Sequence, residues 1–463
     1  LGTPNLAGQL GRALLGASIA PLWGAVGRVA GTLDGLGPRR RAAAALGAGI
    51  LAALLGPWLV ATAGPDSTVP FAVLGTLDAL LIARLLRATD GGRRTARAGL
   101  ALGLALGLTY LARQEVVWIG LTLLLLAVPA IRRLDGDRVR ATLRLLGPVV
   151  VGGLMLVVPW LLRQQLTFGG GAAGQVVDNL LLLRNEQIFA LHDAPTLGAF
   201  LAQGVGGILG NIARAAAMQL TDTVVLGAFP VGVVGVIALI GLRRRPSLRS
   251  ASALVVLLLS GAITFVATAL LFPVATLWGT FQHASGPLLV GLVVAAVLGL
   301  DAVMTRISIA RGWDPVNVIV GPAALIALTV PVTLIQLASV RGSALEMERR
   351  IEAVAAALDV AAATAEDPAG DLAAPLVSDH PMSLAWLLER PVMVIPDDPP
   401  AALGDLARLT GARQLVVFGE GDRYPEVLLH PMGRTCLAEA PVRVGLVDAP
   451  AWLFRIDPAC AVR

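Results

Sequence analysis

The sequence contains no lysine, so all 36 of its basic side chains, histidine aside, are arginines. A P-loop, a Schiff-base enzyme and a serine–lysine dyad each require a lysine amine, and all three are therefore excluded. Cysteine and histidine are scarce, with two and four copies. No group of histidine, cysteine and acidic residues has the spacing of a stable metal site. We expect no resident metal, and the pattern leaves open only a loosely held divalent cation.

Charge is also scarce: 14% of the 463 residues are charged and 56% are hydrophobic. A soluble globule of this composition would lack the polar surface that it needs. The formal net charge is +5, but the arginines fall in short clusters between apolar runs. That pattern is typical of membrane topology rather than of a phosphate-binding stripe. We therefore expect membrane lipid, and not nucleic acid, to be a partner.

About ten apolar runs are long enough to cross a bilayer. A span needs about 20 mostly apolar residues, and its backbone polar groups must pair within the protein, which makes a helix the expected form. The runs lie near residues 13–31, 43–63, 68–86, 97–112, 115–131, 145–163, 223–242, 252–272, 285–304 and 318–339. The sequence thus predicts an all-α polytopic membrane domain over residues 1–340.

Arginine clusters occupy every second loop between these runs. They lie near residues 39–41, 87–97, 132–144, 243–249 and 306–311, and short cytoplasmic loops accumulate positive charge. The other loops carry Asp66, the Arg113/Glu115 pair and a long stretch from about 164 to 222. We therefore predict a multi-pass protein of the cell membrane, with these loops and the C-terminal part on the extracytoplasmic side.

The composition changes after about residue 340. Five short β-rich runs, PLVS, PVMVIP, RQLVVFG, VRVGLVD and WLFRI, are separated by helical stretches such as MSLAWLLE and PPAALGDLARLT. This alternation predicts a C-terminal soluble α/β domain over residues 341–463. The domain shows neither a glycine-rich phosphate loop nor a nucleophile elbow, so we expect it to cover a site or to bind an acceptor. Asp379-His380-Pro381 is expected to cap the helix that follows.

The only two cysteines, Cys436 and Cys460, both lie in this domain. An extracytoplasmic location permits a disulfide, and the two β-like runs between them could form a hairpin that returns one sulfur towards the other. The alternative is two buried free thiols, since Cys460 lies close to the end of the chain.

Several segments resemble a family of membrane enzymes. LLGPWLVATAGPDSTVPFAVLGTLDALLIARLLR is similar to the second and third spans of the GT-C superfamily of membrane glycosyltransferases, in the branch of protein O-mannosyltransferases and bacterial aminoarabinose transferases. In that branch an acidic pair follows a span, as Pro65-Asp66 does here. LGLTYLARQEVVWIGLTLLLL, VPWLLRQQLTFG and GTFQHASGPLLVGLVVAAVLGLD resemble its later spans. The tail, with APLVSDHPMSLAWLLERPVMVIP and LTGARQLVVFGE, resembles the external domain of many bacterial members.

The resemblance implies transfer of a hexosyl or pentosyl group, in the bacterial cell envelope, from a polyprenyl-phosphate donor. The acceptor would be a glycan, a lipid or a protein at the extracytoplasmic face. Members of the family place an acidic residue in the first external loop, between their first two spans. Residues 1–12 resemble the end of that loop. We therefore expect the first span and its carboxylate to be missing here, and a chain of this extent to be inactive.

The external loops supply residues suited to this chemistry, which needs a base for the acceptor hydroxyl and donors that hold the departing phosphate. Asp66 is a candidate catalytic residue, as base or as acceptor-orienting group. Glu115 is a second candidate catalytic residue, because its carboxylate could hold Arg113 in place. The candidate residues for binding the phosphate of the donor are Arg113, Arg163, Gln282 and His283. The two arginines are candidates because guanidinium pairs bidentately with phosphate. Gln282 and His283 are candidates because the family often has a polar, phosphate-facing residue at this place.

Each candidate also has a structural interpretation. Asp66 is a suitable N-cap for the helix after it, and Arg113 with Glu115 could be an ordinary interfacial ion pair. Arg163 could anchor its helix at the lipid headgroups, and His283 could be a structural histidine.

Two other functions compete with the enzyme: a transporter or flippase of lipid-linked glycans, and a non-catalytic membrane scaffold. A transporter would place polar groups near the membrane midplane, whereas these candidates lie in loops. Asp78, inside a predicted span, could either pair with Arg84 or satisfy a neighbouring helix; we expect the second.

Overall fold

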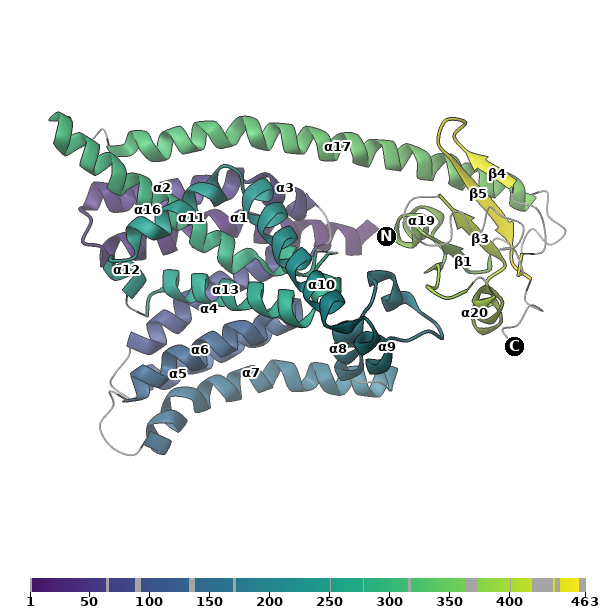
Figure 1. Ribbon diagram of the computed structural model, residues 1–463, viewed down its shortest axis with the longest axis horizontal. Helices are drawn as coiled ribbons and strands as arrows, with labels where there is room; N and C mark the ends of the chain where they lie inside the picture. The colour runs from purple at the N-terminus through teal and green to yellow at the C-terminus, as the bar shows by residue number, and fades with distance from the viewer. Residues whose placement is uncertain are drawn as a thin grey trace. The chain divides into compact units, whose positions relative to one another are not determined.

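The structure is a computed structural model, shown as a ribbon in Figure 1. It describes residues 2–63, 66–87, 93–132, 138–169, 172–249, 251–277, 279–314, 318–363, 373–399, 401–418, 436–437 and 442–457. The contacts divide the chain into two compact units. The membrane unit consists of Leu1–Val176 and Val205–Ala338, and the second unit consists of Val177–Gly204 and Ser339–Arg463. The second unit thus includes part of the long loop as well as the C-terminal region.

The membrane unit is helical throughout its described part. Its helices are α1 (Gly2–Leu33), α2 (Pro38–Leu54), α3 (Gly56–Ala63), α4 (Thr68–Arg87), α5 (Arg93–Ala112), α6 (Val116–Arg132), α7 (Arg138–Phe168), α8 (Ala172–Leu181), α10 (Gly204–Met218), the π-helical η2 (Gln219–Gly227), α11 (Val231–Leu242), α12 (Pro246–Arg249), α13 (Ala253–Leu271), α14 (Pro273–Thr276), α15 (Thr280–Ala284), α16 (Gly286–Arg311) and α17 (Val320–Ala363). Helices α8 and α17 each continue into the second unit.

The described residues contain seven helices that are long and apolar enough to cross a membrane, or up to nine if two bent pairs each count as one span. The bent pairs are α2 with α3, at 59°, and α10–η2 with α11, at 105°. Helix α6 is apolar but shorter, with 17 residues. All ten predicted runs coincide with these helices, which confirms the polytopic all-α fold.

Glycine permits a close approach between α5 and α7. Gly99, Gly103 and Gly107 recur every fourth residue on α5, and a Cβ atom added to Gly103 would lie 2.1 Å from the carbonyl oxygen of Val149 on α7. A Cβ at Gly152 of α7 would lie 2.6 Å from a carbonyl oxygen of α5. Small residues that let helix backbones touch are typical of packing within membranes, because apolar burial there contributes little to helix association.

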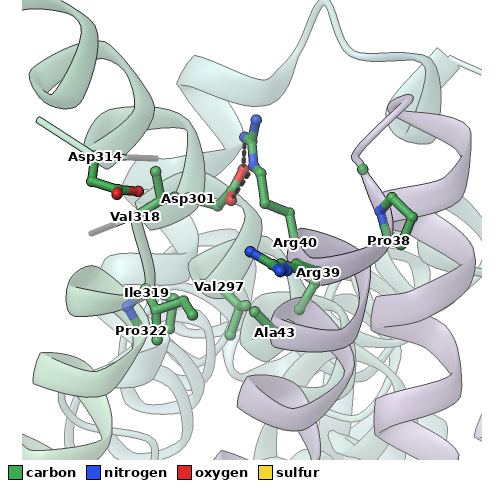
Figure 2. Close-up of a pocket in the computed structure, with 12 residues that line it drawn as sticks. Pro38, Arg39, Arg40, Ala43, Val297, Asp301, Asp314, Val318, Ile319 and Pro322 are labelled. Atoms are coloured by element: carbon green, nitrogen blue, oxygen red, sulfur yellow. Dashed lines mark hydrogen bonds and ion pairs between the residues drawn. The ribbon is translucent and has the colours of Figure 1, made fainter. Parts of the chain in front are cut away.

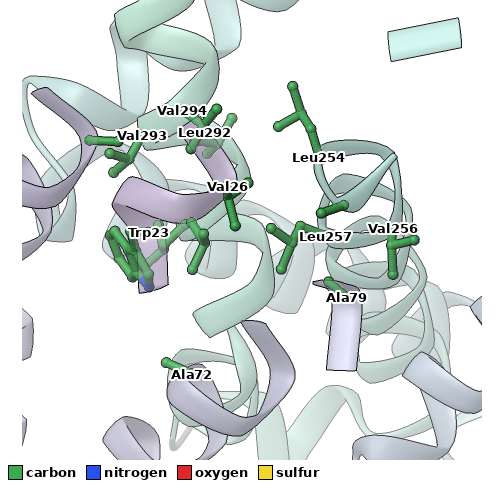
Figure 3. Packing of buried hydrophobic residues seen from close by; sticks show 14 of the residues in the cluster. Trp23, Val26, Ala72, Ala79, Leu254, Val256, Leu257, Leu292, Val293 and Val294 are labelled. Atoms are coloured by element: carbon green, nitrogen blue, oxygen red, sulfur yellow. The ribbon is translucent and has the colours of Figure 1, made fainter. Parts of the chain in front are cut away.

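The centre of the membrane unit is an apolar core. Trp23 is fully buried on α1, and its ring meets that of Trp58 edge to face with centroids 5.5 Å apart. Labelled side chains from α1, α4, α13 and α16 converge on this core in Figure 3. Asp78 on α4 is fully buried, and it accepts a hydrogen bond from Thr109 Oγ1 on α5 at 2.7 Å. The structure therefore confirms that Asp78 satisfies a neighbouring helix.

Helix α17 is one uninterrupted element of 44 residues. The sequence predicted a span over 318–339 and a soluble domain from residue 341, but α17 crosses this boundary without a break. At 1.5 Å per residue the helix is about 66 Å long, which is roughly twice the thickness of a bilayer's hydrocarbon core. It therefore extends beyond a span, and its later part belongs to the second unit.

The second unit contains a mixed five-stranded sheet of order β2-β1-β3-β5-β4. Strands β1 and β2 pair in parallel, as do β1 and β3, whereas β5 pairs antiparallel with both β3 and β4. The elements are the 3₁₀ helix η1 (Asn185–Phe189), α9 (Leu197–Ala202), β1 (Leu376–Ser378), α19 (Pro381–Leu388), β2 (Val392–Val394), α20 (Ala402–Thr410), β3 (Gln414–Val417), β4 (Val442–Gly445) and β5 (Pro450–Arg455). All five predicted strands and both predicted helices are present, so the α/β prediction is confirmed.

Side chains that alternate along the strands form two hydrophobic cores, one on each face of the sheet. Leu376 packs with residues of α17 and α19, whereas Val377 packs with residues of α20. Successive strand residues point to opposite faces, so a strand buried on both faces must be apolar throughout. The LVS and QLVV segments are buried at every position.

Part of the long loop is bound to the carboxyl end of β2. The Asp398 carboxylate accepts backbone hydrogen bonds from Leu191 at 2.5 Å and from His192 and Asp193 at 2.8 Å. Arg184 also forms an ion pair of 2.8 Å with Asp397. Three N–H donors on one carboxylate are a strong attachment for a short segment. The sequence alone gave no sign that residues 177–204 and the C-terminal region form one unit.

Two smaller predictions for this unit have different outcomes. Cys436 is disulfide-bonded; Cys460 lies outside the described residues. The predicted cap at Asp379-His380-Pro381 is wrong, because α19 has His380 at its N-cap and no side-chain cap hydrogen bond. Asp379 instead accepts the backbone N–H of Phe418, at the end of β3, at 3.0 Å. Burial raises the pKa of Asp379, although that hydrogen bond and His380 act in the opposite direction.

Candidate active site

Asp66 lies just before α4, in a turn that it stabilises itself. Its Oδ1 atom accepts hydrogen bonds from the backbone N–H of Thr68, at 2.6 Å, and from the Thr68 hydroxyl, at 2.5 Å. Thr68 is the first residue of α4, and the first N–H groups of a helix have no partner within it. Asp66 therefore stabilises the N-terminus of α4, as its position before the helix suggested.

His283 lies beside Asp66, although 217 residues separate them in the sequence. Its Nδ1 atom lies 3.1 Å from the Asp66 carboxylate and 2.9 Å from Thr68 Oγ1. The contact follows from helix packing, because α16 begins three residues after His283 and touches α4. A Cβ added to Gly286 of α16 would lie only 2.7 Å from the Cβ of Ala72. The two helices meet near their first turns, so the residues just before them are brought together.

The hydrogen bonds indicate which nitrogen of His283 carries a proton towards Asp66. Thr68 has a single hydroxyl proton, and the Asp66 carboxylate can only accept. If the hydroxyl donates to Asp66, then Nδ1 must donate to its oxygen neighbours. The Nε2 atom is then the nitrogen left for another partner. Such a carboxylate–histidine arrangement fixes the orientation of the ring.

Asp66 is ionised at neutral pH. Partial burial by itself would raise the pKa of Asp66, but the hydrogen bonds from Thr68 and the charge of the nearby His283 outweigh it, and the pKa lies below its ordinary value. A carboxylate of low pKa is a weak general base near neutral pH. It is well suited to hold a cation, which favours an orienting role for Asp66.

Arg113 and Glu115 occupy the turn between α5 and α6. The guanidinium donates to both carboxylate oxygens of Glu115, through Nε at 3.1 Å and through Nη2. Its Nη1 atom donates to Ser67 Oγ at 2.8 Å. Both side chains of the pair are only 16% exposed. The pair is therefore bidentate and partly buried, and it holds the residue next to Asp66.

This geometry leaves Arg113 with capacity for a further partner. Three of its five N–H groups are used by Glu115 and Ser67, and the other two have no partner among the described residues. Both oxygens of Glu115 are occupied by Arg113, which suits a positioning role for Glu115.

The two other predicted residues differ in their placement. Gln282 is exposed beside His283 on α15, and its Oε1 atom lies near Gly279. Arg163 is exposed on α7, with its guanidinium carbon 5.2 Å from the centre of the Trp160 ring. Among the described residues, no hydrogen bond or ion pair joins Arg163 to the other candidates. Ser67 and Thr68 thus join Asp66, His283 and the Arg113–Glu115 pair into one cluster, with Gln282 next to His283 in the sequence.

Ser67 and Thr68 are the polar residues that connect this cluster, and the sequence analysis did not single them out. Their hydroxyl positions next to Asp66 were the available signal. Within the described residues, no group of three or more histidine, cysteine or acidic side chains could hold a metal ion.

The comparisons with known proteins bear on the fold. No model of a protein family matches the chain, and no curated protein does either. The structure of ArnT from Cupriavidus metallidurans bound to undecaprenyl phosphate is similar, with a TM-score of 0.53 and 15% identity over 98% of this chain and 85% of that one. The apo structure of the same ArnT gives 0.50 and 16% identity, over 97% and 84% of the two chains. The fold that the predicted resemblance implied is therefore confirmed.

The Arg113–Glu115 pair provides a first test of the site. We expect Arg113→Gln and Glu115→Gln each to destabilise the protein. The double variant should be less destabilised than the sum, with a coupling energy of about 1–2 kcal/mol, because either single change leaves a partly buried charge without its partner. Thermal unfolding of the purified protein in one detergent measures this cycle. Additive losses would mean that the pair contributes nothing beyond its separate residues.

Proposed function

We propose that this protein is a glycosyltransferase that moves a sugar from a polyprenyl-phosphate donor to an acceptor at the extracytoplasmic membrane face. The observation that carries the proposal is the Asp66–His283 contact, flanked by Arg113, at one end of the membrane helices. The similarity to ArnT supports the fold on which such a site is built.

The chemistry assigns a role to each side chain of the cluster. In the transfer, the bond between the anomeric carbon and the phosphate oxygen breaks, and its electron pair stays on the phosphate. The acceptor oxygen forms the new bond and gives up its proton. We assign His283 Nε2 and the two remaining N–H groups of Arg113 to the growing charge on the phosphate. Asp66 and Glu115 act as positioning residues that hold His283 and Arg113.

The acceptor proton requires a base, and Asp66 is a weak one because its pKa is lowered. The resemblance assigns such a role to a carboxylate of the first external loop. Gln282, exposed next to His283, is the residue that we assign to a hydroxyl of the sugar or to a phosphate oxygen. A transporter is the less favoured function, because the predicted polar residues gather at helix ends rather than at mid-span.

A double-variant experiment tests the roles of Asp66 and His283. We expect Asp66→Asn and His283→Gln each to lower turnover by about 10² or more. Because Asp66 acts through His283, the double variant should lose little more than either single one. Transfer of radiolabelled sugar from a polyprenyl-phosphate donor, by protein expressed from its complete reading frame, provides the measurement.

The matched control is Asp222→Asn, which removes an exposed carboxylate on η2 and should leave turnover unchanged. Wild-type turnover in Asp66→Asn would refute the assignment, because Asn preserves the turn at Thr68 but removes the charge. Fully multiplicative losses in the double variant would show instead that the two residues act separately.

We also propose that this site faces away from the cytoplasm, as the arginine clusters predict. Thr167 near the end of α7 and Ala96 near the start of α5 are both exposed and lie at opposite helix ends. In intact cells, a membrane-impermeant maleimide should label Thr167→Cys, whereas Ala96→Cys should be labelled only after permeabilisation. The reverse pattern would invert the topology.

A further inference from the structure

Ser67 carries a hydroxyl proton that has no acceptor in the described part of the chain. Its Oγ atom accepts a hydrogen bond from Arg113 Nη1 at 2.8 Å. A serine hydroxyl can accept through its lone pairs and still donate its single proton, so this contact leaves the proton unused. The side chain is partly exposed, and the acceptor can therefore be a bound ligand.

Helix capping does not account for this serine. Ser67 directly precedes α4, and its carbonyl oxygen accepts the backbone N–H of Phe71 at 3.0 Å, as an N-cap residue does. An N-cap side chain ordinarily accepts the N–H of the second or third helical residue. The third residue of α4 is Pro70, which has no N–H. Among the described residues, no hydrogen bond joins the Ser67 hydroxyl to Val69, the second one. Its oxygen therefore serves Arg113 and not the helix.

A second arginine of the membrane unit forms the same kind of arrangement in a closed form. Arg40 donates to both carboxylate oxygens of Asp301, through Nε at 2.9 Å and through Nη2, and Figure 2 shows this pair. Arg40 Nη2 also donates to Thr305 Oγ1 at 2.8 Å. The Thr305 hydroxyl then donates its own proton to the carbonyl oxygen of Asp301, at 2.6 Å. This hydroxyl is saturated, because it both accepts and donates within the protein.

The arrangement at Arg113 is open by comparison. Two N–H groups of Arg113 and the O–H group of Ser67 have no partner among the described residues, so three donors lie close together. Because Arg113 donates to Ser67 Oγ, it polarises the hydroxyl and makes it a stronger donor. These donors lie beside the first turn of α4, and the N-terminus of a helix favours negative charge. The oxygens of an anion suit such a place.

We propose that Ser67 is a further binding residue of the candidate active site, and that its hydroxyl donates a hydrogen bond to a phosphate oxygen of the lipid-linked donor. The inference rests on the proposed function, because it concerns the phosphate that His283 and Arg113 are assigned to receive. Ser67 keeps its proton and forms no covalent bond. A phosphate oxygen accepts more than one hydrogen bond, so Ser67 adds to the contacts of Arg113. The competing interpretation is that Ser67 only holds Arg113 in position.

Affinity for undecaprenyl phosphate tests this role without any sugar transfer. Ser67→Ala should weaken binding by about tenfold, as expected for one hydrogen bond to a charged group. The same variant should bind undecaprenol, which lacks the phosphate, as the wild type does. Ser67→Thr keeps a hydroxyl and should restore most of the affinity. Protein expressed from its complete reading frame is purified in one detergent and titrated with each lipid, and the bound lipid is measured by native mass spectrometry.

A double variant with Arg113→Gln separates direct donation from positioning. If Ser67 itself donates to the phosphate, Ser67→Ala should weaken binding by about threefold or more even in the Arg113→Gln background. Thr305→Ala is the matched control, because it removes a hydroxyl that accepts from an arginine near the opposite end of α16, and it should bind as the wild type does. Ser67→Cys, a weak donor of similar shape, replaces Ser67→Ala if that variant does not fold.

The proposal is overturned if Ser67→Ala binds undecaprenyl phosphate as tightly as the wild type or Thr305→Ala does, or if it adds nothing to the loss caused by Arg113→Gln. An equal loss of affinity for undecaprenol would also overturn it, since the effect would not concern the phosphate. A failure of the proposed function has a different signature, because Arg113→Gln and His283→Gln would then leave the affinity for undecaprenyl phosphate unchanged as well.

Discussion

The constraint behind this structure is that hydrocarbon offers no hydrogen-bond partner to a peptide group. Each run that crosses the membrane must therefore satisfy its own backbone, and the described runs do so as helices. The free-energy cost of a polar side chain is then small only at a helix end or next to a hydrogen-bond partner. Asp78 illustrates the second case, with Thr109 donating to it, and the cluster around Asp66 illustrates the first. The same constraint that makes the fold helical thus directs the chemistry to the loops.

The position of the candidate site depends on how closely the helices approach. Gly286 lets α16 touch α4 near the first turns of both helices, and this contact places His283 next to Asp66. Arg113 reaches the same place because its hydrogen bond to Ser67 links the α5–α6 turn to the start of α4. Three distant segments form one polar cluster because the packing of their helices fixes where each loop begins.

Much of the architecture was predictable from local patterns. Long apolar runs identify membrane helices, and alternating β-rich and helical stretches identified all five strands of the small sheet. Contacts between distant residues left no such signal. Apolar periodicity does not report that His283 meets Asp66, that residues 177–204 bind the C-terminal region through Asp398, or that α17 continues without a break. The candidate residues were recognisable by type, and the hydroxyls of Ser67 and Thr68 directly after Asp66 were visible in the sequence. Their contacts with Arg113 and His283 follow only from the folded arrangement.

The central claim is that the Asp66–His283 pair and Arg113 receive the phosphate of the lipid donor. A cryo-electron microscopy structure of the protein with bound polyprenyl phosphate tests it directly. The account predicts a phosphate oxygen within hydrogen-bond distance, about 3 Å, of His283 Nε2 and an Arg113 nitrogen, with Asp66 still on Nδ1. A phosphate bound elsewhere, for example at Arg163, with His283 free of it, would contradict the account.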